Sequence, residues 1–171
     1  IHNKGWMVNI QSFFNSYSLL SKLVLVLTGA ANTLAYAPFN IWPLPFFTLT
    51  LLLIAIFASD TNKQAAKYGF YYGLGWFGFG ISWVHVSIAD FGGLPLVVSV
   101  ILMLCLVAYL ALYPTLACWL TAKYKNKLGI WLIVPAWLLT EQLRGWVFTG
   151  FPWLSLGYSQ TQSPLAGFAP V

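Results

Sequence analysis

Residues 96–122 read LVVSVILMLCLVAYLALYPTLACWLTA, without a single Asp, Glu, Lys or Arg. An α-helix needs roughly 20 apolar residues to cross a bilayer, so this run predicts a membrane-spanning helix, with a kink at Pro114. Cys105 and Cys118 would lie about 20 Å apart on that helix, which is too far for a disulfide. We therefore expect both cysteines to be buried free thiols.

The composition of the whole chain agrees with this assignment. Of the 171 residues, 60% are hydrophobic, 18% aromatic and only 6% charged, whereas soluble domains carry about 25% charged residues. Eleven charged side chains cannot cover a water-facing surface, which excludes an ordinary soluble domain. The net charge of +5 comes from short basic clusters between apolar runs, a pattern that indicates membrane topology and not a nucleic-acid partner.

Apolar runs on both sides of residues 96–122 predict an all-α, polytopic transmembrane helix bundle with five spans and the beginning of a sixth. The expected spans are residues 19–37, 44–59, 68–86, 96–122, 128–145 and 165–171. Residues 1–22 are expected to form a cytoplasmic or interfacial segment before a transmembrane domain over residues 23–171. Because the chain starts at Ile1 and ends in an apolar stretch, we expect it to be a piece of a longer protein.

Polar, glycine and proline residues predict the connections between these spans. The expected connections are a proline-rich turn over 37–45, a polar hairpin over 60–67, a loop over 87–95, a basic hairpin over 123–127 and an outer loop over 146–164.

The lysines predict the orientation of the bundle. With a cytoplasmic N-terminus, the inner face collects seven basic residues and the outer face only Arg144. The seven are Lys4, Lys22, Lys63, Lys67, Lys123, Lys125 and Lys127. This distribution follows the positive-inside rule, and it places the remaining polar groups, and with them the functional face, on the outside.

Residues 141–158, EQLRGWVFTGFPWLSLGY, combine an acid, a base, glycines, a proline and aromatic residues at the end of an apolar run. A charge inside a bilayer costs roughly 2.5–3.5 kcal/mol, so we interpret this stretch as the outer rim of a site. The candidate residues are Glu141, Arg144, Gly150, Phe151, Pro152, Trp153 and Tyr158, joined by Trp83, His85 and Asp90 near the outer end of the third predicted span.

Each candidate group also has a structural interpretation. Arg144 could bind a lipid phosphate while Glu141 orients it, or the two could form a structural ion pair on one helix face. The turn over 150–153 could gate lipid entry or anchor the bundle at the interface. For His85, which Asp90 could orient as an acid–base group, interfacial hydrogen bonding is the favoured account.

Other patterns carry no chemistry. Glycines at positions 69, 73, 75, 78 and 80 predict close packing between helices. Nucleophile elbows, metal-ligand spacings and phosphate-binding loops are missing from the sequence, so we predict no metal, no cofactor and no complete catalytic centre in this chain.

Three stretches together resemble the N-terminal membrane domain of bacterial apolipoprotein N-acyltransferases. They are TLAYAPFNIWP at 33–43, GISWVHVSIADFGG at 80–93 and EQLRGWVFTGFPWLSLGYSQ at 141–160, in the order of that family. The third stretch is long and specific, and the resemblance spans most of residues 23–171.

The resemblance implies that the parent protein moves an acyl chain from a phospholipid to the N-terminal cysteine amine of diacylglyceryl-lipoproteins, at the periplasmic face of the bacterial inner membrane. It implies a Glu–Lys–Cys triad and a thioester acyl-enzyme in a nitrilase-like domain further along the chain. Neither Cys105 nor Cys118 matches that nucleophile, so the catalytic residues are expected outside this chain. The implied partners are the phospholipid donor, the lipoprotein acceptor and membrane lipids, and we expect a monomer.

A non-enzymatic alternative stays open. A stand-alone membrane scaffold or lipid-binding module could descend from the same ancestor and lack the catalytic domain. A small transporter is disfavoured, because the interiors of the predicted spans are nearly uncharged and no inverted repeat is evident.

Overall fold

The computed structural model describes residues 12–14 and 19–168, without the side chains of 126–130 and 168. Helices account for most of this part of the chain, which confirms the predicted all-α class. The α-helices are α2 (Leu19–Asn32), α3 (Leu44–Ala58), α4 (Asn62–Gly80), α5 (Val84–Gly92), α6 (Leu96–Leu128) and α7 (Ile133–Trp146). Short 3-10 turns are η1 (Thr33–Ala35), η2 (Gly129–Leu132), η3 (Val147–Thr149), η4 (Leu156–Gln160) and η5 (Ala166–Phe168).

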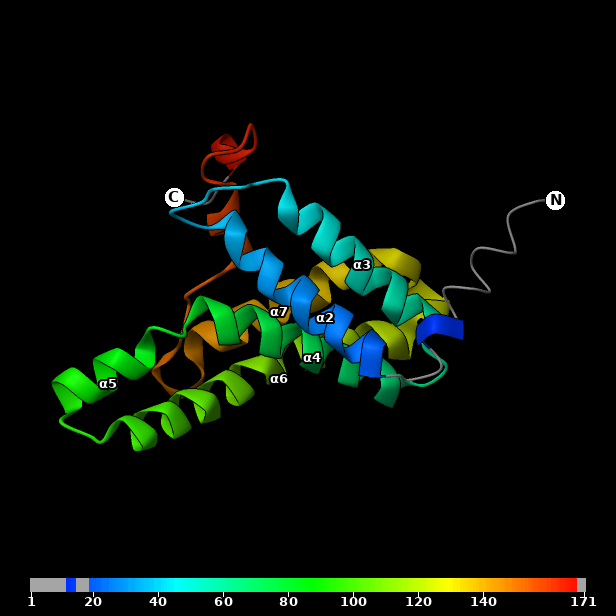
Figure 1. Cartoon of the computed structure of the whole chain (residues 1–171). Helices are drawn as coiled ribbons and strands as arrows, with labels where there is room; N and C mark the ends of the chain where they lie inside the picture. The colour runs from blue at the N-terminus through cyan, green and yellow to red at the C-terminus, as the bar shows by residue number, and fades with distance from the viewer. Residues whose placement is uncertain (1–11, 15–18, 169–171) are drawn as a thin grey trace.

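The long helices run side by side in alternating directions, so the bundle has two ends (Figure 1). We call one the basic end, because the start of α4 and the end of α6 bring Lys63, Lys67, Lys123 and Lys125 there. We call the other the aromatic end, where the α2–α3 turn, the end of α4 and the loop after α7 meet. Helix α5 and the first turns of α6 project beyond the bundle at the aromatic end (Figure 1).

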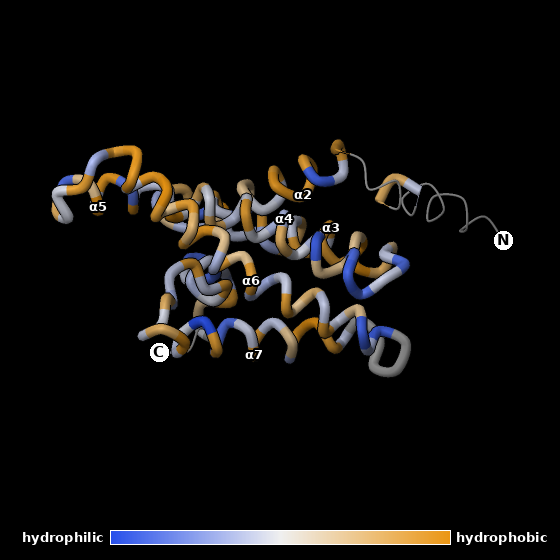
Figure 2. The backbone as a smooth tube through the Cα atoms, turned by 90° about the horizontal axis from the view of Figure 1, so that it is seen from below, coloured by the Kyte–Doolittle hydropathy of each residue, from blue (hydrophilic) through white to orange (hydrophobic). Residues whose placement is uncertain are grey.

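Large apolar side chains are exposed on the outside of the bundle, among them Leu27, Phe47, Val97 and Leu138. Figure 2 shows the backbone coloured by the hydropathy of each residue. Among the described residues, α6 is the helix that is both long and apolar enough to cross a membrane, over Leu96–Lys125. Helices α2 with η1 and α3 are apolar but shorter. Helix length therefore supports one span, and the predicted count of five stays a prediction.

Helix α4 lies between α2 and α6, and its glycines allow both neighbours to approach closely. A Cβ atom at Gly75 would overlap the carbonyl oxygen of Val26 in α2, and one at Gly73 would lie 2.9 Å from the Cα of Ala111 in α6. The prediction that the α4 glycines serve close packing is confirmed at these positions. Gly78 is different, because a Cβ there would meet only a side-chain atom of Val107, at 3.8 Å.

The remaining face of α4 supplies a buried aromatic stripe, formed by Tyr68, Tyr72 and Trp76 at four-residue spacing. The indole of Trp76 stacks on that of Trp137 in α7 with 5.8 Å between ring centroids, which ties α7 to the centre of the bundle.

The two cysteines of α6 differ in exposure. Cys118 is a buried free thiol, as expected, whereas Cys105 is exposed, so the expectation of two buried thiols is wrong for Cys105. The two positions face different sides of the helix, one toward α4 and the other toward the apolar outer surface.

Three predicted connections are wrong because helices continue through them. Helix α4 already begins at Asn62 inside the predicted 60–67 hairpin, where Thr61 caps it by accepting a hydrogen bond from the Gln64 N–H at 3.2 Å. The predicted 87–95 loop is largely α5, which ends at Gly92 and is capped by Gly93 in the left-handed region with φ of 64°. Helix α6 runs through the predicted basic hairpin 123–127 to Leu128, because lysines are good helix formers.

The last predicted segments agree in part. Helix α7 begins at Ile133, with Pro135 in its first turn, where a proline is tolerated. The predicted outer loop 146–164 consists of 3-10 turns and irregular chain after Trp146. Of the predicted sixth span, residues 165–168 contain the turn η5 and the rest lie outside the described residues. Most of the predicted 1–22 segment, including Lys4, lies outside them as well.

Candidate functional site

An open cavity of about 700 Å³ lies at the aromatic end of the bundle. Its walls come from the α2–α3 turn, the end of α4 and the loop that follows α7. The lining residues are Tyr36, Ala37, Asn40, Gly80, Trp83, Pro152, Trp153, Leu154, Tyr158, Thr161 and Gln162. The three stretches that resemble the acyltransferase motifs are far apart in the chain, and here they meet around one cavity.

Aromatic rings form much of the cavity wall. The indoles of Trp83 and Trp153 lie against each other with 6.2 Å between ring centroids, which joins the second motif to the third. About half of each side chain is exposed, at 50% for Trp83 and 56% for Trp153, and Tyr158 is exposed as well. These rings are free to contact an apolar or amphipathic ligand that enters the cavity.

Arg144 lies beneath this wall and is only 2% exposed. Its Nη1 donates a hydrogen bond to the carbonyl oxygen of Trp153 at 2.5 Å, and its Nη2 donates to the Ser155 hydroxyl at 3.1 Å. The guanidinium also lies over the ring of Phe77, 5.2 Å from the centroid. The side chain is thus held by the loop over residues 150–158, which we call the rim loop, and by the bundle core.

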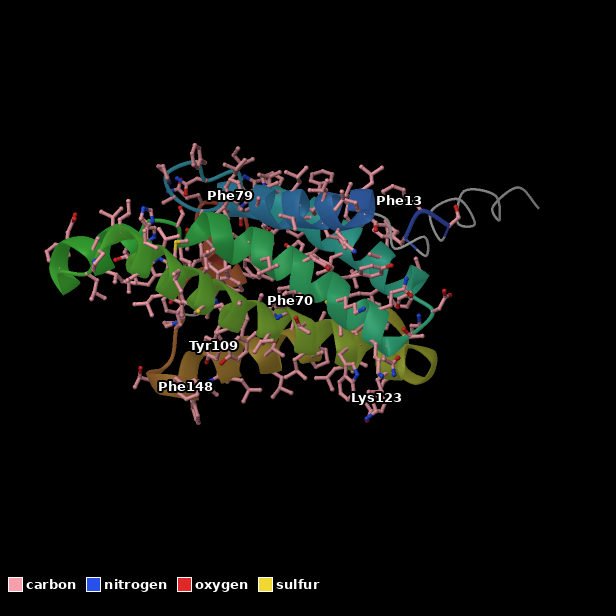
Figure 3. The ribbon with its side chains drawn as sticks, turned by 60° about the horizontal axis from the view of Figure 1, so that its bottom comes forward. Phe13, Phe70, Phe79, Tyr109, Lys123 and Phe148 are labelled. Atoms are coloured by element: carbon pink, nitrogen blue, oxygen red, sulfur yellow. The ribbon has the colours of Figure 1, made fainter. Side chains whose placement is uncertain are left out.

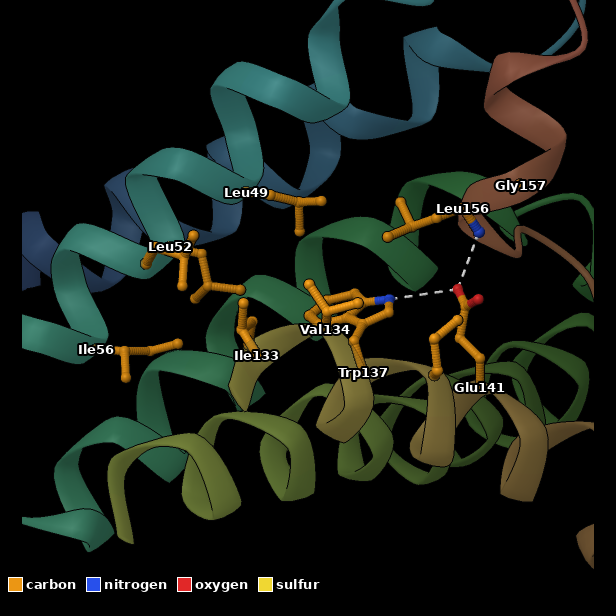
Figure 4. A pocket seen from close by; sticks show the side chains of 11 residues that line it. Leu49, Leu52, Ile56, Ile133, Val134, Trp137, Glu141, Leu156 and Gly157 are labelled. Atoms are coloured by element: carbon orange, nitrogen blue, oxygen red, sulfur yellow. Dashed lines mark hydrogen bonds between the residues drawn. The ribbon is translucent and has the colours of Figure 1, made fainter. Parts of the chain in front are cut away.

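Glu141 is half-buried beside Arg144, and Figure 4 shows its hydrogen bonds to Leu156 and Trp137. Its Oε1 lies 3.8 Å from Nη2 of Arg144, which confirms the predicted pair, and it accepts hydrogen bonds from the Leu156 N–H at 2.9 Å and the Trp137 indole at 3.4 Å. Of the two interpretations of the pair, the geometry favours the structural one. Arg144 makes its hydrogen bonds to the rim loop, and Glu141 makes its own to the rim loop and to Trp137 of α7, so a phosphate is not needed to satisfy them.

The rim loop and the two residues before it have an unusual backbone. Phe148, Thr149 and Leu154 have positive φ angles of 51°, 72° and 59°, and Gly150 has φ of 83°. A Cβ atom at Gly150 would overlap the carbonyl oxygen of Gly145, so only glycine fits there without a shift. The next residue, Phe151, donates its N–H to the Arg144 carbonyl at 2.8 Å and packs its half-buried ring against the core. These contacts keep several residues in a rarely populated conformation.

Tyr36 is a site residue that the sequence analysis did not single out. It is buried, and its hydroxyl donates a hydrogen bond to the carbonyl oxygen of Leu154 at 2.9 Å. A Cβ at Gly80 would overlap the side chain of Leu154, so the end of α4 also presses on the rim loop. The only signal for Tyr36 was its place in the first of the three motif-like stretches.

His85 and Asp90 do not join the other candidates. Both lie on α5, outside the cavity lining, and the ring Nδ1 of His85 contacts the carbonyl oxygen of Ser82. The two residues are five positions apart on a helix and so face different sides, and no hydrogen bond joins them in the described part of the chain. Within the same residues, no three His, Cys, Asp or Glu side chains gather where they could hold a metal ion.

A second, apolar groove of about 270 Å³ lies between α3 and α7 (Figure 4). Its lining includes Leu49, Leu52, Ile56, Ile133, Val134 and Trp137. Leu156 of the rim loop and Glu141 close it at the aromatic end. The groove is therefore an apolar channel along α3 and α7. It ends at Glu141, which holds the rim loop through the Leu156 N–H.

Comparison with known proteins identifies relatives of the chain. The family model described as apolipoprotein N-acyltransferase N-terminal domain matches residues 28–171. Apolipoprotein N-acyltransferase of Vibrio parahaemolyticus is 47% identical over 159 residues, and that of Vibrio cholerae 48% over 160, with 91% of this chain covered in each case. The protein of the same name from Nitrosomonas europaea is 46% identical over 148 residues, or 84% of the chain. The chain spans only about a third of these relatives, at 31%, 32% and 30% of their lengths.

Proposed function

The chain belongs to the apolipoprotein N-acyltransferase family, and we propose on this premise that it is the membrane-embedded N-terminal part of such an enzyme. The enzyme would transfer an acyl chain from a phospholipid to the N-terminal cysteine amine of diacylglyceryl-lipoproteins. The acyl chain would pass through a thioester on a Glu–Lys–Cys triad that lies outside these residues. Cys118 is buried and Cys105 lies on the outer face of α6, so neither is placed to serve as that nucleophile.

The observation that carries the proposal is the cavity at the aromatic end, where all three motif-like stretches converge. Its exposed rings, Trp83, Trp153 and Tyr158, suit the glycerol and upper acyl carbons of a lipid, and its backbone and amide groups suit a polar head. Arg144 and Glu141 act in this proposal as positioning residues, which hold the rim loop so that Trp153 faces the cavity.

The apolar groove between α3 and α7 supports a lipid substrate. It contains almost only aliphatic and aromatic side chains and ends under the rim loop, as a channel for an acyl chain would. A lipid seated there would bring its head toward the aromatic end, where the rest of the enzyme would act on it.

For the location, we propose a multi-pass protein of the bacterial inner membrane, with the aromatic end on the periplasmic side. The lysines gathered at the opposite end support this orientation through the positive-inside rule.

The test is N-acylation of a diacylglyceryl-lipopeptide by the full-length protein with Trp153→Ala. Loss of one substrate-contacting ring predicts a decrease of kcat/KM by roughly tenfold or more, at unchanged membrane insertion. Trp146→Ala is the matched control, because Trp146 is an exposed tryptophan at the same end that does not line the cavity. Equal activity of the two variants would remove the cavity from substrate binding, and absence of acyl transfer by the wild-type protein would favour the non-enzymatic scaffold.

A further inference from the structure

The apolar groove between α3 and α7 has two different ends (Figure 4). At one end lie Glu141 and Leu156, which belong to the polar contacts that hold the rim loop. At the other end lie Ile56 of α3 and Ile133 of α7, which we call the far end. A ligand that fills the groove from the rim loop inward therefore meets two aliphatic side chains at the far end.

The length of the groove matches that of an acyl chain in one leaflet. The groove runs from the aromatic end of the bundle toward the basic end, which Figure 3 marks with Phe148 and Lys123. Glu141 and Ile133 are eight residues apart on α7, which corresponds to about 12 Å of helix. The hydrocarbon of one leaflet is roughly 15 Å thick, which is half of the bilayer core. An acyl chain that starts at the membrane surface therefore reaches the far end.

The width of the groove suits a single hydrocarbon chain. A volume of about 270 Å³ along about 12 Å leaves a mean cross-section of roughly 20 Å². An α-helix with its side chains is about 10–12 Å across, so a further helix does not fit inside the groove. Val134 and Leu138, on the α7 side of the lining, are exposed at the outer surface of the bundle. A chain can therefore enter the groove sideways from the surrounding lipid.

The rim loop connects the groove to the cavity at the aromatic end. Leu154 and Tyr158 line the cavity, whereas Leu156 and Gly157, which lie between them in the sequence, line the groove. The two spaces thus share one short segment of chain as a wall. A lipid whose polar part lies at the cavity can therefore place one of its chains in the groove.

Building on the proposed function, we propose that the groove receives the acyl chain that is transferred, and that Ile56 and Ile133 determine its length. Ile56 is buried and Ile133 is half-buried, so neighbouring helices hold both side chains in place. A chain longer than the groove has to displace them, whereas a shorter chain leaves apolar surface without contacts. Each methylene group that is buried changes the affinity by about fourfold. The two isoleucines are therefore specificity-determining residues and take no part in the chemistry.

The test measures which acyl chain the full-length protein transfers to a diacylglyceryl-lipopeptide from an equimolar mixture of dimyristoyl and distearoyl phosphatidylethanolamine. Mass spectrometry of the product gives the ratio of stearoyl to myristoyl groups. Ile133→Ala extends the groove and should raise this ratio by roughly fourfold or more, the effect of one buried methylene group. Ile133→Phe shortens the groove and should lower the ratio by a similar factor. Both donors compete for the same enzyme molecules, so partial misfolding of a variant does not change the ratio.

Ile54→Ala and Ile54→Phe are the matched controls, because Ile54 is a half-buried isoleucine of α3 that does not line the groove. We expect both controls to keep the wild-type ratio. Acyl transfer with a wild-type ratio in both Ile133 variants would overturn the role of the far end and leave the proposed function standing. Equal shifts in the Ile54 and Ile133 variants would overturn it as well. Absence of transfer by the wild-type protein would instead remove the proposed function, and chain selection by the groove with it.

Discussion

The guanidinium of Arg144, near the end of α7, donates a hydrogen bond of 2.5 Å to the carbonyl oxygen of Trp153, whose indole lines the cavity at the aromatic end. The Arg144 side chain thus points into the bundle and holds the backbone of Trp153, whose indole faces the cavity. If the rim loop moved away, the buried Arg144 charge would lose its hydrogen bonds, which is energetically costly. The contact therefore fixes the rim loop to the bundle.

We expect Arg144→Lys to loosen the rim loop. A lysine has no planar fork to reach both the Trp153 carbonyl and the Ser155 hydroxyl. Hydrogen exchange in residues 150–158 of the full-length protein should accelerate by roughly tenfold, which corresponds to about 1.4 kcal/mol of local stability. In parallel, kcat should fall. Glu141→Gln is the milder companion, because its amide oxygen can still accept from the Leu156 N–H. Unchanged exchange in Arg144→Lys would rule out the bracing role.

Gly75→Ala should destabilise the bundle by about 1–3 kcal/mol, because its new methyl group would overlap the Val26 carbonyl at the contact between α2 and α4. The thermal midpoint of the purified protein in detergent is the readout. Gly78→Ala is the matched control on the same helix, since its methyl group would meet only Val107, at 3.8 Å. Equal midpoints for the two variants would contradict the close-packing interpretation.

Tyr36→Phe removes the hydroxyl that donates to the Leu154 carbonyl and leaves that oxygen without its partner. We expect a loss of about 1–3 kcal/mol in stability and a smaller decrease in acyl transfer, because the first motif then no longer holds the rim loop. Tyr124→Phe, an exposed tyrosine toward the basic end, should have no measurable effect. The same small effect in both variants would show that the hydrogen bond contributes little.

Lys125→Met should weaken the connection between α6 and the end of α3. The Lys125 ammonium donates to the carbonyl oxygens of Ser59 at 2.8 Å and of Ile56 and Phe57 at 3.4 Å, at the end of α3, where the helical hydrogen bonding stops. We expect a decrease of about 1–2 kcal/mol in stability, measured by thermal unfolding against Lys63→Met, whose side chain is exposed. A midpoint equal to that of the control would show that water serves these carbonyls equally well.

Helices were predicted well where apolar composition alone determines them, and poorly where polar residues interrupt it. Residues 96–122 were recognised because a long uncharged run has few alternatives to helix. The same reasoning failed at residues 87–95 and 123–127, where Asp, Gly and Lys suggested turns although α5 and α6 continue. Local polarity is a weak indicator of a turn when neighbouring helices extend beyond the apolar region.

The sequence analysis named several of the residues that line the cavity, but not their arrangement. Trp83, Pro152, Trp153 and Tyr158 line one cavity, whereas His85 and Asp90 lie apart on α5. Residue types at the end of a span indicate that a site is nearby, but the direction of each side chain depends on helix phase and on the path of the loop. Tyr36 shows the limit, because its partner Leu154 is 118 positions away along the chain.

The sequence by itself determined the all-α class, the apolar surface, the glycine contacts of α4 and the family resemblance, because each follows from composition or from local spacing. Only the tertiary structure decided that Arg144 points inward to hold Trp153 and that three distant stretches enclose one cavity. These relationships join residues on different helices. They depend on which helices become neighbours of α4 and in what orientation, and local spacing does not specify either.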